Sequence, residues 1–213
     1  MFSRQWRLVL PASAPGLIQP DGARRTAVGM GGGGAVFYDW SKNAWAGAAA
    51  AGYPGIAIGE GAGIIYLEKR QALFVFGALG KPAAPATWLC DLTTNTWTDL
   101  KPATSPPGDR TGAMCYLPDQ DAVFAGVFRS YEKRTFEGDE WAYSFADRTW
   151  RQVPTTAKLG DKWPLNVPPP AYHSAWDKLV YDPKHGVLLR PGWVMRPDLS
   201  RRAGDAAVAP AMP

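Results

Sequence analysis

The chain has 213 residues with 23 glycines, 20 prolines and 10 tryptophans, and it carries a formal net charge of +4. Glycine and proline are frequent enough to exclude long helices, whereas a hydrophobic content of 46% argues against disorder of the whole chain. The positive charge is too small to indicate nucleic-acid binding. No apolar run is long enough for a transmembrane helix.

Residues 1–34 are expected to form an irregular N-terminal segment. Pro11 and Pro15 interrupt its start and no clean cleavage site follows, so we predict no signal peptide. The glycine run 31–34 stands where a hairpin of a regular repeat would lie. The short segment Trp6–Val9 resembles later strand segments and is a candidate to donate one outer strand.

From residue 35 onward a pattern recurs about every 50 residues. An apolar segment is followed by a small polar residue that starts a turn, and a tryptophan stands six residues after that residue. Trp45, Trp97 and Trp150 mark this period with spacings of 52 and 53 residues. The residues that start the turns are Asp39, Asp91 and Ser144. A fixed period of this length indicates a repeat architecture.

A second element recurs in register with the first. Two apolar runs enclose a short polar turn in the segments 63–76, 113–125 and 178–189, and the first run of each ends at Tyr66, Tyr116 or Tyr181. Such segments predict β-hairpins. Each repeat should therefore contain four short strands, and the tight connections make neighbouring strands antiparallel.

These residues resemble kelch repeats, as found in the galactose-oxidase-like β-propellers. The resemblance covers roughly residues 35–195 and lacks one feature, because the usual glycine pair after the second strand is reduced to one glycine. It rests on the strings at 39–45 and 91–97, the single glycines Gly77, Gly126 and Gly192, and the lead-in Pro106–Arg110. The resemblance implies an all-β propeller of four-stranded antiparallel blades. It also favours a periplasmic or extracellular location.

At about 53 residues per repeat, the chain holds about four blades, the last of them incomplete. Two ways of completing the fold remain open at this point. Residues 6–9 add an outer strand to the last blade and close a four-bladed ring, or the ring stays incomplete and a partner or second copy covers its edges. The tail 196–213 is expected to be extended or disordered.

Both large insertions should emerge on the same rim of the predicted sheets. One is the connection 128–138 inside the third repeat, and the other is the segment 158–170 that follows it. Insertions in repeat folds commonly lie on the binding face. The predicted binding residues there combine aromatic and charged side chains: Arg129, Tyr131, Arg134, Phe136, Asp161 and Trp163.

Residues suited to catalysis are few. The chain has two cysteines, Cys90 and Cys115, and two histidines, His173 and His185. They are too few for a predicted metal site or triad, so we expect no metal, no cofactor and no catalytic residues. Carboxylates at Asp139, Glu140 and Asp161 leave glycoside hydrolysis as a formal alternative.

The sequence therefore favours a non-catalytic protein-interaction module or an accessory subunit of a larger assembly. A protein partner or self-association is expected. The alternative is a carbohydrate-binding or carbohydrate-active propeller protein that uses the same loops, with Trp163 and Tyr131 against the sugar.

Overall fold

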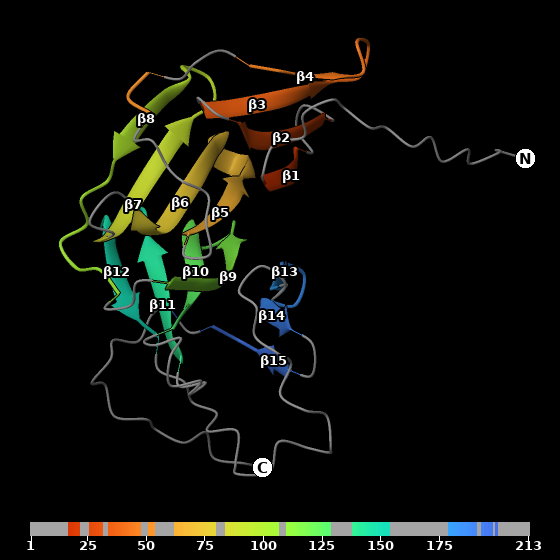
Figure 1. The fold of residues 1–213 in the computed structure, drawn as a ribbon. Helices are drawn as coiled ribbons and strands as arrows, with labels where there is room; N and C mark the ends of the chain where they lie inside the picture. The colour runs from red at the N-terminus through yellow and green to blue at the C-terminus, as the bar shows by residue number, and fades with distance from the viewer. Residues whose placement is uncertain are drawn as a thin grey trace, which may run out of the picture.

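The computed structural model describes residues 17–21, 26–31, 34–47, 51–53, 62–79, 84–106, 110–128, 138–153, 179–190, 193–197 and 199. These residues form four separate antiparallel sheets, which confirms the expected all-β class (Figure 1). None of the four sheets closes on itself. Among the described residues, no helix is long and apolar enough to cross a membrane.

Each sheet is a meander in which consecutive strands are hydrogen-bonded neighbours. We call the sheets A to D in chain order. Sheet A consists of β1 (Leu17–Asp21), β2 (Thr26–Gly31), β3 (Gly34–Asp39) and β4 (Ala44–Ala46). Sheet B consists of β5 (Ala62–Leu67), β6 (Ala72–Leu79), β7 (Ala84–Asp91) and β8 (Thr96–Asp99). Sheet C consists of β9 (Arg110–Leu117), β10 (Ala122–Phe128), β11 (Gly138–Ser144) and β12 (Thr149–Gln152). Sheet D consists of β13 (Val180–Asp182), β14 (Val187–Arg190) and β15 (Trp193–Met195).

All three hairpins expected from the sequence are present, as β5–β6, β9–β10 and β13–β14. Two elements differ from expectation. β1 and β2 lie within the segment 1–34 that we expected to be irregular; β1 pairs with β2, and β2 pairs with β3. The last repeat holds a third strand, β15, whereas the sequence indicated only two. In both places pairing with a neighbouring strand outweighs the weak strand propensity of glycine and proline.

One loop geometry is used in six hairpins. Each loop has four residues and its fourth residue has a positive φ, between 46° and 62°. The residues at this fourth position are Asn43, Gln71, Asn95, Asp121, Arg148 and Gly186. A left-handed residue costs a non-glycine about 1–2 kcal/mol, and asparagine tolerates it best. The Asn of the repeated string is therefore explained by the backbone of the turn.

The sheets stack face to face in chain order. Their first strands follow one another, because β1 contacts β5, β5 contacts β9 and β9 contacts β13. A separate apolar core fills each junction. Between A and B lie Val28, Ala35, Ile64, Leu73, Val75, Cys90 and Trp97; between B and C lie Leu67, Phe74, Phe76, Val123, Ala125, Tyr143 and Trp150; between C and D lie Leu117, Phe124, Ala142, Tyr181 and Leu188.

The repeated tryptophan always lies on the same face of its sheet. Trp97 of sheet B packs into the core that sheet A shares, and Trp150 of sheet C packs into the core that sheet B shares. The ring of Trp150 lies 4.6 Å from that of Phe76, centroid to centroid. Each of these tryptophans thus fills the space toward the preceding sheet, as large aromatic side chains do in cores.

The described parts of the connections from sheet A to B and from sheet B to C lie along the outer edge of the sheet that follows. Ala51, between sheets A and B, exchanges backbone hydrogen bonds with Asn95 and Trp97 beside β8. Thr104, between sheets B and C, donates from its hydroxyl to the backbone oxygen of Trp150 in β12. These contacts satisfy part of the exposed edge of each outer strand.

One buried hydrogen bond joins two sheets through a repeat tryptophan. The indole Nε1 of Trp150 donates to Thr87 Oγ1 over 3.0 Å, and the Thr87 side chain is fully buried. Thr87 stands ten residues before Trp97, the tryptophan of its own sheet. The residue at the same place in sheet A, ten positions before Trp45, is Ala35, whose side chain has no acceptor. The indole Nε1 of Trp97 is accordingly buried without a partner.

We expect the substitution Thr87→Val to lower the free energy of unfolding by about 1–3 kcal/mol, because it leaves the buried Trp150 donor unsatisfied at nearly constant volume. Urea denaturation of the two proteins measures the difference. The matched control is Thr98→Val on exposed β8, for which a change within about 0.5 kcal/mol is expected. Equal losses in both variants would show that the hydroxyl of Thr87 carries no specific role.

Candidate interaction surface

The predicted binding residues Arg129, Tyr131, Arg134, Phe136, Asp161 and Trp163 lie outside the described residues. The structure does describe the strand ends from which the first loop leaves. Phe128 of β10 pairs with Gly138 of β11 at the last position of their ladder. The loop 129–137 therefore starts and ends at one point of sheet C, at the end opposite the tight hairpin loops.

The described hairpin loops all lie on one rim of the stack, which we call the hairpin rim. In sheet B the loops 68–71 and 92–95 are adjacent, and the backbone N of Leu92 donates to the backbone oxygen of Gln71. Phe145 and Asp121 repeat this contact in sheet C. The opposite rim, which we call the loop rim, carries the connections between the second and third strands, as the alternation of strand direction predicts.

Carboxylates in the repeated string cap the hairpin loops. Asp39 Oδ1 accepts hydrogen bonds from the backbone N of Ser41 and Lys42, and Asp91 Oδ1 accepts them from Thr93 and Thr94. Asp182 accepts equivalent bonds in sheet D, and Ser144 Oγ replaces the carboxylate in sheet C. These bonds are typical of Asx turns. The string predicted as a repeat marker is therefore a local folding signal.

Two of the three tyrosines predicted as repeat markers form a hydrogen bond with the fourth residue of their own loop. Tyr66 Oη accepts a hydrogen bond from Gln71 Nε2 over 2.7 Å. Tyr116 Oη donates to Asp121 Oδ1 over 2.8 Å. In sheet D the fourth residue is Gly186, which offers no side chain, and Tyr181 Oη instead donates across the sheet junction to Asp119 over 2.6 Å.

A group of polar contacts on the hairpin rim joins sheets B and C. Arg70 forms a two-pronged ion pair with Asp121, with 2.8 Å from Arg70 Nε to Asp121 Oδ1. The Arg70 guanidinium also lies 4.0 Å from the centre of the Phe145 ring, and Lys69 Nζ donates to the backbone oxygen of Pro118. Hydrogen bonding to Arg70 lowers the pKa of the Asp121 carboxyl.

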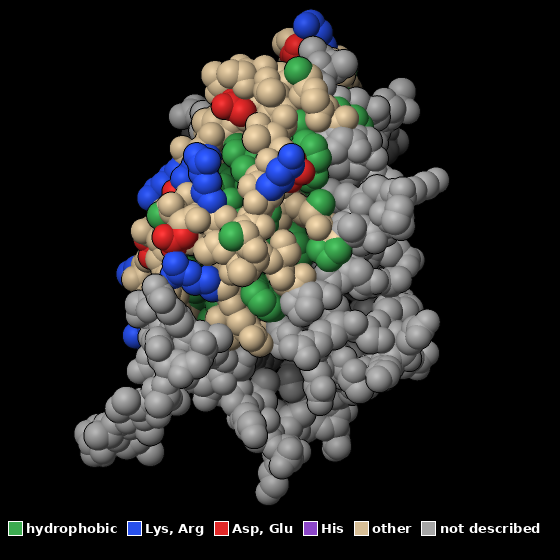
Figure 2. All heavy atoms as spheres, turned by 90° about the vertical axis from the view of Figure 1, so that its left-hand side faces the viewer, with side chains coloured by type: hydrophobic (Ala, Val, Ile, Leu, Met, Phe, Trp, Pro, Cys, Tyr) green, Lys and Arg blue, Asp and Glu red, His purple; other side chains and the backbone are tan. Residues whose placement is uncertain are grey.

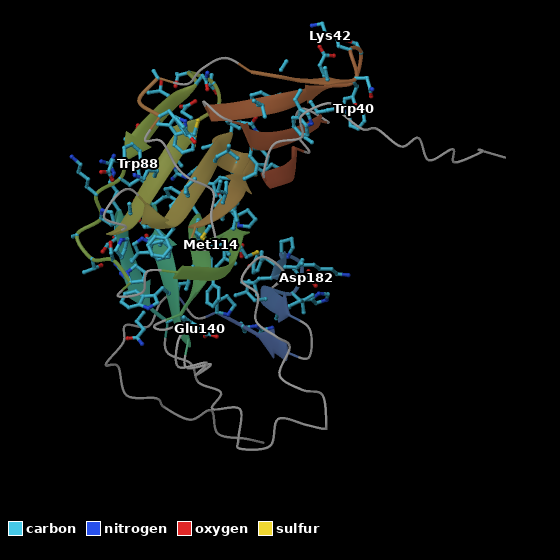
Figure 3. All side chains as sticks on the ribbon, viewed as in Figure 1. Trp40, Lys42, Trp88, Met114, Glu140 and Asp182 are labelled. Atoms are coloured by element: carbon cyan, nitrogen blue, oxygen red, sulfur yellow. The ribbon has the colours of Figure 1, made fainter. Side chains whose placement is uncertain are left out.

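The outer face of sheet A carries an aromatic cluster. Tyr38 and Trp45 are paired across β3 and β4, and their ring centroids lie 5.3 Å apart. Trp40 lies edge-on to Tyr38 at 4.7 Å from the adjoining loop, and 64% of its surface is exposed. Figure 3 labels Trp40 in the loop beside this end sheet and Asp182 in the other end sheet, D. An exposed aromatic side chain of this kind is typical of interaction surfaces.

A cavity of about 210 Å³ lies against the outer half of sheet C. Its wall is partly apolar, from Ala142, Val153 and Leu199, and partly polar, from the side chains of Asp147 and Arg151. Arg151 Nη2 and Asp147 Oδ2 form an ion pair, so both charges are already engaged within the chain.

Figure 2 shows the side of the molecule formed by the outer strands. Among the described residues on this side, Lys and Arg side chains are interspersed with Asp and Glu side chains and with apolar ones. This distribution agrees with the small net charge.

The described residues considered for catalysis have structural roles or unfavourable ionisation. Burial raises the pKa of the Cys90 thiol to about 12 and that of Cys115 to about 11. His185 Nδ1 lies 2.5 Å from Asp182 Oδ2 within an exposed turn. Glu140 lies in β11, whereas His173 and the side chains of Asp139 and Asp161 are outside the described residues. Within the described part of the chain, no three metal-ligating residues come together.

Comparison with known proteins adds no family assignment. No protein-family model matches the chain, and a search of curated proteins finds no match.

Asp121→Asn should lower stability at neutral pH, because it removes the charge that Arg70 binds. The folded-state pKa of Asp121 is lowered, so this stabilisation is present above the unfolded pKa of about 3.9 and is lost as pH falls through the folded value. Urea denaturation from pH 7 to pH 3 should show the difference between the two proteins shrinking below about pH 4. A difference that stays constant down to pH 3 would contradict this assignment.

Neither thiol should react readily in the folded protein. With pKa values of about 12 and 11, Cys90 and Cys115 are almost entirely protonated at pH 8, and the thiolate is the reacting form. A colorimetric thiol reagent should therefore modify both slowly in buffer and at the rate of a free thiol in urea. A native rate at pH 8 equal to the rate in urea would refute the stated burial.

Proposed function

We propose that this chain is a kelch-like, propeller-type protein-interaction module with no catalytic activity, which binds its partner through the loop rim at 128–138 and 158–170. It acts as an interaction domain or as an accessory subunit of a larger assembly.

The arrangement of the sheets supports a propeller-type architecture. Four meanders follow one another in chain order, and the first strand of each contacts the first strand of the next. The described parts of the A–B and B–C connections, at Ala51 and Thr104, contact the outer strand of the following sheet. A propeller uses the same stacking, which covers the sheet faces and leaves only short edges exposed.

The difference between the two rims is the observation that carries the proposed function. On the hairpin rim the described loops have four residues each, and their side chains cap turns or join sheets. On the loop rim, the connection between the second and third strands varies in length from sheet to sheet. It spans two residues in sheets A and D, between Gly31 and Gly34 and between Arg190 and Trp193, but nine residues in sheet C. Length variation confined to one rim of a repeated scaffold is typical of a binding face.

The test is to shorten that loop. Replacing residues 129–137 by Pro-Gly copies the connection that sheet D already uses between β14 and β15. We expect the full-length chain, affinity-purified from its native cells, to carry a different protein at a fixed stoichiometry. The shortened chain should lose that protein at least about tenfold and keep its thermal midpoint.

Ala146→Lys on the hairpin rim is the matched control, because residue 146 is exposed in a loop of the same sheet, and it should retain the partner. Retention of the partner by the shortened chain would contradict the proposal. So would a native chain that carries no other protein, or one whose loop rim binds a glycan on an array.

A further inference from the structure

Three large apolar side chains of the described residues are strongly exposed, and all three belong to the two end sheets. Trp40, in the loop between β3 and β4 of sheet A, is 64% exposed, and Val180 and Leu189 in sheet D are 55% and 38% exposed. The inner sheets B and C are covered on both faces. Among the described residues, this exposure is therefore confined to the two end sheets and the loop that joins β3 to β4.

The open face of sheet A is equivalent to a face that is buried in sheets B and C. Trp45 pairs with Tyr38 in sheet A as Trp97 pairs with Cys90 and as Trp150 pairs with Tyr143. Trp97 and Trp150 each pack on the preceding sheet. Trp45 carries the same large ring on the same face, but in the described structure no sheet precedes sheet A.

The open face of sheet D is equivalent to the face that sheets A, B and C each turn toward the next sheet. Leu188 of β14 points into the core shared with sheet C, so its neighbour Leu189 points the opposite way. Val180 lies directly opposite Leu189 on β13. In sheet B the corresponding position is Phe74, which is fully buried against sheet C.

We propose that these two faces bind each other between two copies of the chain, with sheet A of one copy packed on sheet D of the second. The contact continues a junction that the chain already makes three times, between A and B, B and C, and C and D. Within one copy sheet A does not cover the open face of sheet D, because Val180 is 55% exposed. Two copies related by a two-fold axis satisfy both faces of both chains and close the assembly.

This interface uses the sheet faces and leaves the loop rim free. It therefore goes beyond the proposed function, and either can fail without the other.

The test is the mass of the full-length chain in solution. Sedimentation equilibrium should give twice the chain mass of 23.1 kDa. Two variants each place a charge at one end sheet: Trp40→Lys in the loop beside the outer face of sheet A, where Trp40 contacts Tyr38, and Val180→Lys on sheet D. Each variant should weaken self-association at least about tenfold, since a buried unpaired charge is strongly unfavourable. Both positions are exposed in the single chain, so both variants should fold.

Mixing the two variants tests the pairing of A with D. An equimolar mixture contains one unsubstituted A face and one unsubstituted D face, so we expect it to form a heterodimer more weakly than the native chain. The control Ala146→Lys adds the same charge on the hairpin rim and should leave the dimer unchanged.

Three results would overturn the inference. The first is a native chain that is a monomer at every concentration. The second is a Val180→Lys variant that dimerises as the native chain does, which would point to contact between two A faces. The third is a mixture of the two variants that stays monomeric.

Discussion

The rest of the structure depends on the burial of both faces of a four-stranded sheet. Residues 72–77 of β6 are buried without interruption, as are residues 122–125 of β10. A continuous buried run requires apolar cover on each side of the strand, so sheet B needs sheets A and C, and sheet C needs B and D. Stacking in chain order follows, because the connection from each outer strand leads directly to the next first strand. Among the described residues, the outer faces of sheets A and D have no further sheet packed against them.

The repeat conserves a geometry more strictly than it conserves residues. The fourth loop position is left-handed in six hairpins, yet asparagine, glutamine, aspartate, arginine and glycine all occupy it. Where Tyr66, Tyr116 or Tyr181 stands five residues earlier, its hydroxyl finds a different partner in each case. Tyr116 binds Asp121 in its own loop, and Tyr181, facing Gly186, binds Asp119 of the adjacent sheet. A local turn interaction is thereby converted into a link between sheets.

Much of the fold was predictable from the sequence, because its signals are local. Two apolar runs on either side of a polar turn predicted the β5–β6 and β9–β10 hairpins. The turn-starting residues with the tryptophan six positions later predicted the hairpins of the third and fourth strands. β1, β2 and β15 were missed, since Pro20, the glycine run 31–34 and Gly192 carry little strand signal and those strands form through pairing.

The Arg70–Asp121 pair joins residues 51 positions apart, so no local pattern indicates it. The open faces were also hidden, because Trp45 looks like the buried Trp97 and Trp150 in sequence. The binding residues predicted on the loop rim stay predictions.

Native-state hydrogen exchange followed by mass spectrometry at several protein concentrations tests the central claim most directly. The account predicts that the amides of β6 and β10 are the most protected and that their protection is independent of concentration, because cover for these strands comes from within the chain. Protection of β3 and β14, in the end sheets, should rise as concentration rises and copies associate. Uniform protection of all four strands at every concentration would contradict a series of sheets with two open ends.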